Sequence, residues 1–324
     1  LGGEKSLEKL SSINNVDAIT ALARLDVKMA ASRATSLLKS PLKPEAIQQL
    51  IQSLLRQRRG SESLLQALKE KISSDNARIA LRTIRATGRK EAKLIDAVMK
   101  AGSLKNQRKL TETERNQWIA DVTRLGDAAR GEVVFRRASL SCLKCHAIAG
   151  AGGRVGPDLI SIGASAPVDY LLDSLLLPNK AIKENYHSLI VETSKGRVHT
   201  GIKIREANKE LILRTAEDQE IRIPTKEIES KRQGTSLMPE GLTDSLTRQE
   251  VLDLTRFLSE LGKVGPYQVT PERVVRRWRA LTPSSQVTYQ LRRQGFATVA
   301  RAGAWQNWES AYSQVSGALP LQSL

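Results

Sequence analysis

The sequence predicts a mainly α, multidomain protein that carries a small inserted antiparallel β-module. Apolar residues recur every three to four positions across residues 17–110, the period of amphipathic helices. The period changes to two across about 186–232, which is typical of short antiparallel strands, and returns to helical spacing over 247–262. At 324 residues the chain is long enough for two or three domains.

Residues 1–110 form the first predicted domain. Segments such as EAIQQLIQSLL and ARIALRTI have helical spacing, breaks fall at SPLKP and TGR, and Pro44 suits a helix start. Short amphipathic helices in succession, with Ala and Leu at the inner positions, suit a stacked-helix solenoid. The stretch resembles HEAT-type repeats, although no strict repeat is visible, and an irregular helical bundle is the alternative.

Charge is distributed unevenly along the chain. The formal net charge is +17, but residues 1–110 hold 22 Lys and Arg against 10 Asp and Glu, whereas residues 111–263 hold 22 of each. Such an excess favours an acidic partner, an anionic surface or nucleic acid, or it is simply a solvated basic face. Residues 1–110 contain no Trp, Tyr or Phe, which argues against stacking on single-stranded nucleic acid.

Residues 111–263 form the second predicted domain, which opens with helices. TETERNQWIADVTRL places Glu114 three residues after Thr111, the spacing of a capping box. Asp127 is a suitable N-cap for DAARGEVVFRRA, and PVDYLLDSLLLP is a further helix. The β-module follows at about 186–232 within this domain, with turns at SKGR, REANK and AEDQ.

Residues 264–324 are predicted to be a C-terminal tail or part of a further domain, in which VTPERVVRRWRAL suits a helix. This region includes Trp278, Trp305 and Trp308. No apolar run is long enough to cross a membrane. Because the chain begins at Leu1 rather than Met, we interpret it as a mature or excised fragment. The lack of a secretory signal therefore does not indicate in which cellular compartment the protein lies.

Both cysteines of the chain stand in SCLKCH, residues 141–146. A bare C-x-x-C is shared by thiol oxidoreductases, half zinc sites and haem sites, whereas a histidine directly after it favours c-type haem attachment. Two thiols at this spacing can reach the two vinyl groups on one porphyrin edge, and the next turn places His146 under the iron. A thiol oxidoreductase would need a preceding strand, and a zinc site would need further ligands, for which His187 and His199 are the obvious nitrogen donors.

Further residues around SCLKCH fit a haem site. Gly131 and Phe135 lie one helical turn apart before the motif, and SLMPEGL precedes a closing helix that carries Phe257. Pro157, in VGPDL, follows His146 by eleven positions. A backbone carbonyl in such a loop can accept a hydrogen bond from the second nitrogen of the histidine and so fix its ring.

In this order, GEVVF, CLKCH, VGPDL, SLMPEGL and EVLDLTRFLSEL resemble a class I cytochrome c. The strand-rich segment between the haem motif and the MP motif resembles, more specifically, the haem-binding domain of large planctomycete and verrucomicrobial proteins. The resemblance covers about residues 127–262. It implies a class I cytochrome c fold with an inserted antiparallel β-module, preceded by the helical-repeat region.

The resemblance also implies one covalently bound haem c. The implied attachment residues are Cys142 and Cys145, and the implied iron ligands are His146 on the proximal side and Met238 on the distal side. A methionine before a proline in a loop suits a rigid ligand, and a thioether ligand raises the reduction potential. Two alternatives stay open: Met238 only covers the haem edge, or a second histidine binds the iron.

Arg154, Lys144 and Phe135 are further candidates for contact with the haem. Arg154 or Lys144 could pair with a propionate, although both could equally be exposed. The helices that bear Phe135 and Phe257 are expected to cross at one edge of the haem.

A haem with both axial positions filled transfers electrons and has no open site for substrate. The resemblance therefore implies electron transfer through one haem c that serves a dehydrogenase or a respiratory protein, and the basic N-terminal region favours an acidic partner. A non-catalytic protein, or the cytochrome part of an oxidoreductase, is favoured. A haem enzyme or small-ligand binder with an open distal site, and a basic helical scaffold for protein interaction, are the alternatives. Because bacteria attach c-type haem outside the cytoplasm, we expect a periplasmic or otherwise extracytoplasmic location and no nucleic-acid partner.

Overall fold

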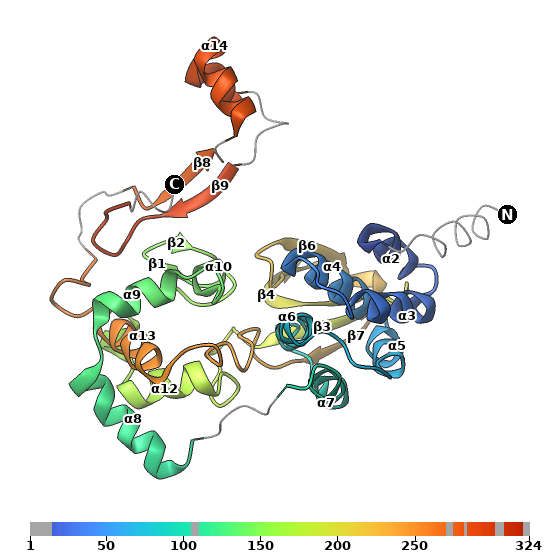
Figure 1. The fold of residues 1–324 in the computed structure, drawn as a ribbon, viewed down its shortest axis with the longest axis horizontal. Helices are drawn as coiled ribbons and strands as arrows, with labels where there is room; N and C mark the ends of the chain where they lie inside the picture. The colour runs from blue at the N-terminus through green and yellow to red at the C-terminus, as the bar shows by residue number, and fades with distance from the viewer. Residues whose placement is uncertain (1–14, 105–109, 270–274, 282–283, 302–307, 320–324) are drawn as a thin grey trace. The chain divides into compact units, whose positions relative to one another are not determined.

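The computed structural model describes residues 15–104, 110–269, 275–281, 284–301 and 308–319 (Figure 1). Contacts divide the chain into two compact units. Unit 1 comprises Leu1–Ala120 and Leu172–Thr247, and unit 2 comprises Asp121–Leu171 and Arg248–Leu324. The chain therefore passes between the units three times.

Unit 1 begins, among the described residues, with six helices that share one core. They are α2 (Val16–Leu22), α3 (Val27–Leu37), α4 (Pro44–Leu55), α5 (Gly60–Ala67), α6 (Ser74–Arg85) and α7 (Ala92–Ala101). The side chains of Asn15 and Asp26 cap α2 and α3, and Pro44 opens α4 as predicted. Buried Leu, Ile and Ala side chains from all six helices pack together. The helical prediction is confirmed, and the HEAT-type repeat stays a prediction.

An antiparallel sheet with the strand order β6-β5-β4-β3-β7 belongs to the same unit. Its strands are β3 (Ser188–Thr193), β4 (Val198–Ala207), β5 (Glu210–Arg214), β6 (Glu220–Pro224) and β7 (Ile228–Gln233). Val191 of β3 lies opposite His199 of β4. Leu211 and Leu213, which alternate along β5, pack with Val191 and Ile223 into a core of their own. The predicted antiparallel strands are confirmed.

Backbone hydrogen bonds join this sheet to loops between the N-terminal helices. Gln57, after α4, forms a β-bridge with Arg197 at the turn between β3 and β4. The amide of Thr235 donates to the carbonyl of Gly88 over 2.8 Å. Gly88 has a φ of 63°, and a Cβ atom there would lie 2.3 Å from the hydroxyl of Ser188, so this approach requires glycine.

The fold class predicted from the sequence is wrong. The described residues contain thirteen α-helices together with the five-stranded sheet and two two-stranded sheets, which makes a mixed α/β protein rather than a mainly α protein with a class I cytochrome c fold. The physical reason is that the strands bury a hydrophobic core of their own and pair with loops of the helical region. The sheet is thus a main element of unit 1 and not a small module inserted into helices.

Two helices run across the boundaries between the units, α8 (Glu112–Leu125) and α12 (Val168–Leu176). The predicted capping box at the start of α8 is confirmed. The hydroxyl of Thr111 accepts from the amide of Glu114 over 3.2 Å, and the Glu114 carboxylate accepts from the amide of Thr111 over 2.9 Å.

Unit 2 holds the segment that contains SCLKCH. Its elements up to the C-terminal region are α9 (Ala128–Arg136), α10 (Cys142–Cys145), β1 (Ala147–Ile148), β2 (Ala151–Gly152), α11 (Ile162–Ser165) and α13 (Arg248–Glu260). Asp127 caps α9 as predicted. α9 and α13 approach closely at Gly131, where a Cβ atom would lie 2.0 Å from the carbonyl oxygen of Asp253. The guanidinium of Arg130 donates to both side-chain carboxylate oxygens of Asp253, at 2.7 and 2.9 Å. The helices that bear Gly131 and Phe257 pack against each other as predicted, and their place at the edge of a haem stays a prediction.

The C-terminal region of unit 2 contains β8 (Arg277–Leu281), α14 (Ser285–Arg301) and β9 (Trp308–Tyr312). Trp278 of β8 lies opposite Ala311 of the antiparallel β9. The helix predicted for VTPERVVRRWRAL is therefore wrong for Arg277–Leu281, while residues 270–274 and Trp305 lie outside the described residues. Among the described helices, none is long and apolar enough to cross a membrane.

Candidate functional site

The two cysteines lie on a single helical turn, α10. Ser141 precedes the turn in the left-handed conformation, with a φ of 59°, and the amide of His146 closes it by donating to the carbonyl of Cys142 over 2.8 Å. Residues three positions apart on a helix face the same side. Cys142, which is buried, and Cys145, which is half-buried, therefore project from one side of the turn, and His146 follows directly where the helix ends.

The imidazole of His146 is oriented by a carbonyl group eleven residues further along the chain. Its Nδ1 atom lies 2.9 Å from the carbonyl oxygen of Pro157. Because a carbonyl oxygen can only accept, Nδ1 carries the hydrogen, and the neutral ring leaves the Nε2 lone pair for a ligand. Burial lowers the pKa of His146, against the opposing effects of this hydrogen bond and of the Asp158 carboxylate. The neutral, metal-binding form is thereby favoured.

Gly156 lies directly beside the imidazole. A Cβ atom at this position would be 2.4 Å from Cε1 and 2.7 Å from Nδ1 of His146, closer than any side chain allows. The amide of Gly156 donates to the carbonyl of Cys145 over 2.7 Å, and that of Gly153 donates to Leu143 over 2.8 Å. The glycine-rich loop thus folds back onto α10 and the ring. Gly156 lies in VGPDL, but its role beside the ring was not predicted from the sequence.

Asp158 closes the same loop. Its carboxylate accepts hydrogen bonds from the amides of Ala149 at 3.0 Å, Gly150 at 2.8 Å and Ile160 at 2.9 Å. A short acidic side chain directly after a proline is typical of such turns, and this was the signal in the sequence that could have identified it. Asp158 therefore holds the loop whose Pro157 carbonyl orients His146.

Phe135, predicted to contact the haem, is buried where α9 and α13 pack. Its ring centroid lies 5.6 Å from that of Phe257, and Phe257 meets Tyr267 edge-on at 5.3 Å. These rings fix the end of α9, which leads directly into the segment that carries α10. Contact between Phe135 and a haem stays a prediction.

Arg154 and Lys144, the predicted partners of a propionate, are both exposed. Their role stays a prediction. Arg277 of β8, which the sequence did not single out, donates to the carbonyl of Gly152 over 2.5 Å. The C-terminal hairpin thus contacts the glycine-rich loop.

Met238 belongs to unit 1, whereas His146 belongs to unit 2. The half-buried Met238 donates its amide to the hydroxyl of Ser236 over 3.1 Å, and the amide of Ser236 donates to the side chain of Asn179 over 3.0 Å. Asn179 also donates to the carboxylate of Glu240 over 2.7 Å. These bonds brace the loop around Met238 as a rigid ligand position would require, and its ligation of iron stays a prediction.

The other histidines considered as ligands also belong to unit 1. His187 is exposed just before β3, and His199 lies near the start of β4. Within the described ranges, no three His, Cys, Asp or Glu side chains gather closely enough to hold a metal ion.

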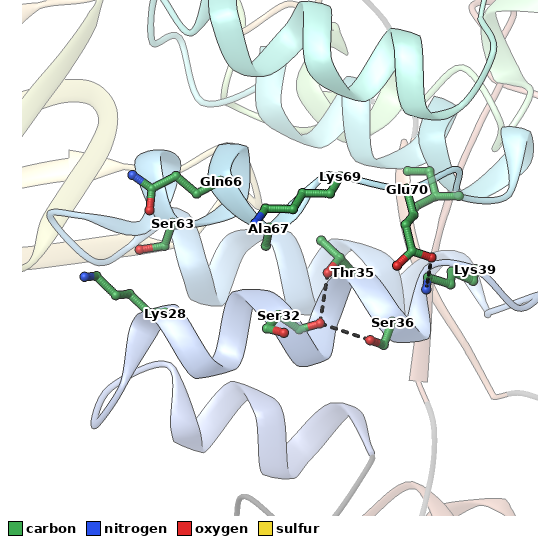
Figure 2. Close-up of a pocket in the computed structure, with 11 residues that line it drawn as sticks. Lys28, Ser32, Thr35, Ser36, Lys39, Ser63, Gln66, Ala67, Lys69 and Glu70 are labelled. Atoms are coloured by element: carbon green, nitrogen blue, oxygen red, sulfur yellow. Dashed lines mark hydrogen bonds and ion pairs between the residues drawn. The ribbon is translucent and has the colours of Figure 1, made fainter.

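A polar pocket of about 350 Å³ lies between α3 and α5 (Figure 2). Lys39 and Glu70 form an ion pair of 2.6 Å at one end, and the hydroxyls of Thr35 and Ser36 donate to the carbonyl of Ser32. Its lining contains neither histidine nor cysteine and belongs to unit 1. This pocket is therefore separate from the chemistry of SCLKCH.

No family model matches the chain, and no curated protein matches it. The functional assignment accordingly depends on the chemistry of the site. Two thiols on one side of a helical turn, followed by a neutral imidazole with Nε2 free of the proton, are the donors that a c-type haem requires. The residues present fit that group.

Proposed function

We propose that the chain binds one haem c covalently and passes single electrons. Cys142 and Cys145 would form the two thioether bonds, and His146 would bind the iron through Nε2. The hydrogen bond from His146 Nδ1 to the Pro157 carbonyl supports this proposal most directly. Metal-binding histidines almost always donate their other nitrogen to such an acceptor, which fixes the tautomer and the ring.

When bound, the haem supplies reversible one-electron oxidation and reduction of its iron. The chain's own residues prepare the ligand. Pro157 accepts the hydrogen bond from Nδ1 and so increases the basicity of Nε2. Gly156 leaves room beside the ring, and Asp158 holds the turn that carries Pro157. Together these contacts keep the imidazole in one orientation.

Met238 is the proposed second axial ligand. Its thioether is a suitable donor for haem iron, and the bonds from Ser236 and Asn179 fix its loop. With both axial positions filled, the iron would have no open position for a substrate. Electron transfer is therefore proposed ahead of a haem enzyme.

We further propose that the partner is an acidic redox protein, such as a dehydrogenase, that meets the basic N-terminal region. The excess of 22 Lys and Arg over 10 Asp and Glu in residues 1–110 supports this choice. Since bacterial c-type haem is attached outside the cytoplasm, an extracytoplasmic location follows from the proposed cofactor. We propose no nucleic-acid partner.

Optical spectra of the ferric and ferrous protein, produced together with a haem-attachment system, test the proposal. We expect low-spin c-type spectra and the weak far-red band of a thioether–iron bond. A high-spin spectrum, or a low-spin spectrum without that band, would remove Met238 and favour an open-site haem enzyme or a second histidine ligand. The absence of any haem signal would contradict the proposal as a whole.

A further inference from the structure

Basic residues from three distant parts of the sequence lie within electrostatic reach of one another in unit 1. Arg24 follows α2, Arg56 caps the end of α4, and Arg197 and His199 flank the start of β4. Burial lowers the pKa of Arg197, and the charges of Arg24 and Arg56 lower it further. Burial likewise lowers the pKa of His199, with further contributions from Arg197 and Arg56. The positive charge of neighbouring arginines therefore acts on both Arg197 and His199.

The backbone fixes this arrangement. Gln57 forms a β-bridge with Arg197, and the amide of Val198 donates to the carbonyl of Arg56 over 3.0 Å. The amide of Arg58 donates to the carbonyl of Gly196 over 3.0 Å on the other side of the bridge. Arg56 and Arg197 are thus held as neighbours by hydrogen bonds of the main chain.

The described residues supply this cluster with no carboxylate. Arg58, next to it, forms ion pairs with Glu192 and Glu229, whereas no ion pair joins Arg24, Arg56 or Arg197 to any described residue. In addition, the Nε atom of Arg197 is buried without a hydrogen-bond partner among the described residues. A buried donor without an acceptor is costly, and so is the convergence of like charges.

The dipoles of the neighbouring helices stabilise only part of the positive charge in this cluster. Arg24 and Arg56 stand at the carboxyl ends of α2 and α4, where positive charge is favourable. Arg197 lies in the β-bridge directly before β4 and gains nothing from a helix dipole, yet among these arginines its guanidinium is the one with an unsatisfied buried nitrogen. An acceptor from outside the described residues would satisfy it.

We infer that Arg24, Arg56 and Arg197, with His199 beside them, form a binding site for a phosphate group. The planar guanidinium group presents paired N–H donors that match the oxygens of a phosphate, and a dianion offsets the converging positive charges. Arg24 and Arg56 are exposed, so the phosphate can be free or can end a larger molecule. This site lies in unit 1, and its occupation does not depend on haem.

Binding of inorganic phosphate to the full chain tests the inference, at constant ionic strength with chloride as the reference anion. We expect phosphate, more than chloride, to raise the thermal midpoint. We also expect it to shift the imidazole resonances of His199, one of only three histidines in the chain. Arg197→Gln should weaken phosphate binding about tenfold or more, and Arg56→Gln should do the same. Because Arg56 is exposed, its substitution is not expected to disturb folding, so weaker binding in this second variant would not come from a folding defect.

Arg205→Gln, an exposed arginine further along β4, is the matched control and should leave phosphate binding unchanged. Equal effects of phosphate and chloride on the wild type would overturn the inference, and so would binding that survives both Arg197→Gln and Arg56→Gln. Binding of glycerol 2-phosphate distinguishes between a free phosphate ion and a phosphate group on a larger molecule as the ligand. Binding as tight as that of inorganic phosphate would indicate a phosphate carried on a larger molecule, and binding of inorganic phosphate alone would indicate the free ion.

Discussion

The Nδ1 atom of His146 lies 2.9 Å from the carbonyl oxygen of Pro157, and this hydrogen bond decides which ring nitrogen is free. With the hydrogen on Nδ1, the Nε2 lone pair is the one that can bind a metal. The chain therefore presents a preoriented imidazole next to two thiols. The proposed haem site depends on this contact and on the residues that maintain it.

Gly156→Ala should disturb this orientation. Its Cβ atom would lie 2.4 Å from the imidazole, so the ring or the loop must move. We expect a partial or complete loss of the low-spin ferric spectrum. Gly150→Asn is the matched control, because Gly150 has open space around it and asparagine tolerates its φ of 76°. Identical spectra of Gly156→Ala and the wild type would show that the ring does not lie where we place it.

Asp158→Ala removes three hydrogen-bond acceptors from the loop at once. We expect the free energy of unfolding to fall by about 1–3 kcal/mol, because the amides of Ala149, Gly150 and Ile160 lose their partners. Asp158→Asn keeps one acceptor oxygen and should lose less. Chemical denaturation measures the stability, and amide exchange at Ala149 and Gly150 reports the loop. Unchanged protection of both amides in Asp158→Ala would argue against the closing role.

Gly131→Ala should destabilise the packing of α9 on α13. The added methyl group would lie 2.0 Å from the carbonyl oxygen of Asp253, so the helices must separate at a cost of about 1–3 kcal/mol. Val133→Ala, at an exposed position of the same helix, should change the unfolding free energy by less than about 0.5 kcal/mol. Thermal or urea denaturation of the two variants provides the comparison, and equal stabilities would rule out the close approach.

Asp173 should make folding sensitive to acid. Arg115 donates to both of its oxygens at 2.7 Å and lowers its pKa; burial opposes this effect and Lys180 adds to it. Because the folded pKa lies below the unfolded one, this stabilisation is complete above the ordinary carboxyl range, near about pH 4, and is lost as the pH falls through that range. The difference in unfolding free energy between the wild type and Asp173→Asn should thus shrink on acidification.

Denaturation curves at neutral pH and near about pH 3 measure this difference on both sides of the carboxyl range. Asp75→Asn, at an exposed position on α6, is the control. A difference between the wild type and Asp173→Asn that is the same at both pH values would mean that Arg115 does not lower the pKa of Asp173.

Met238→Ala should open the iron to exogenous ligands such as cyanide or imidazole and leave the covalent attachment intact. We expect at least about a tenfold gain in affinity, since no side chain must be displaced. Met99→Ala changes a methionine of the N-terminal helical core and should have no such effect. Equal affinities of Met238→Ala and the wild type would remove Met238 from the distal position.

Local signals in the sequence predicted local structure well. The capping box of Thr111 and Glu114, the N-cap at Asp127 and the antiparallel strands after residue 187 all depend on neighbouring residues, and each is confirmed. The hydrogen bond from His146 to Pro157 was also anticipated, because the spacing of VGPDL from the histidine allowed it.

Contacts between distant segments were the ones that escaped prediction. Arg277–Leu281 has helical spacing but forms a strand, because it pairs with Trp308–Tyr312 about thirty residues later. The bridge of Gln57 with Arg197 links segments that no local pattern connects, and it helps to make the fold mixed α/β. Gly156 could not be assigned for the same reason, since only the folded loop brings it to His146.

The mass of the intact protein, produced with a haem-attachment system, tests the central claim most directly. We predict that the wild-type chain gains the mass of one haem, which survives acid–organic extraction, and that the variant with both Cys142→Ser and Cys145→Ser does not. A wild-type chain of unmodified mass, with both thiols open to alkylation, would contradict covalent haem attachment and return SCLKCH to thiol or zinc chemistry.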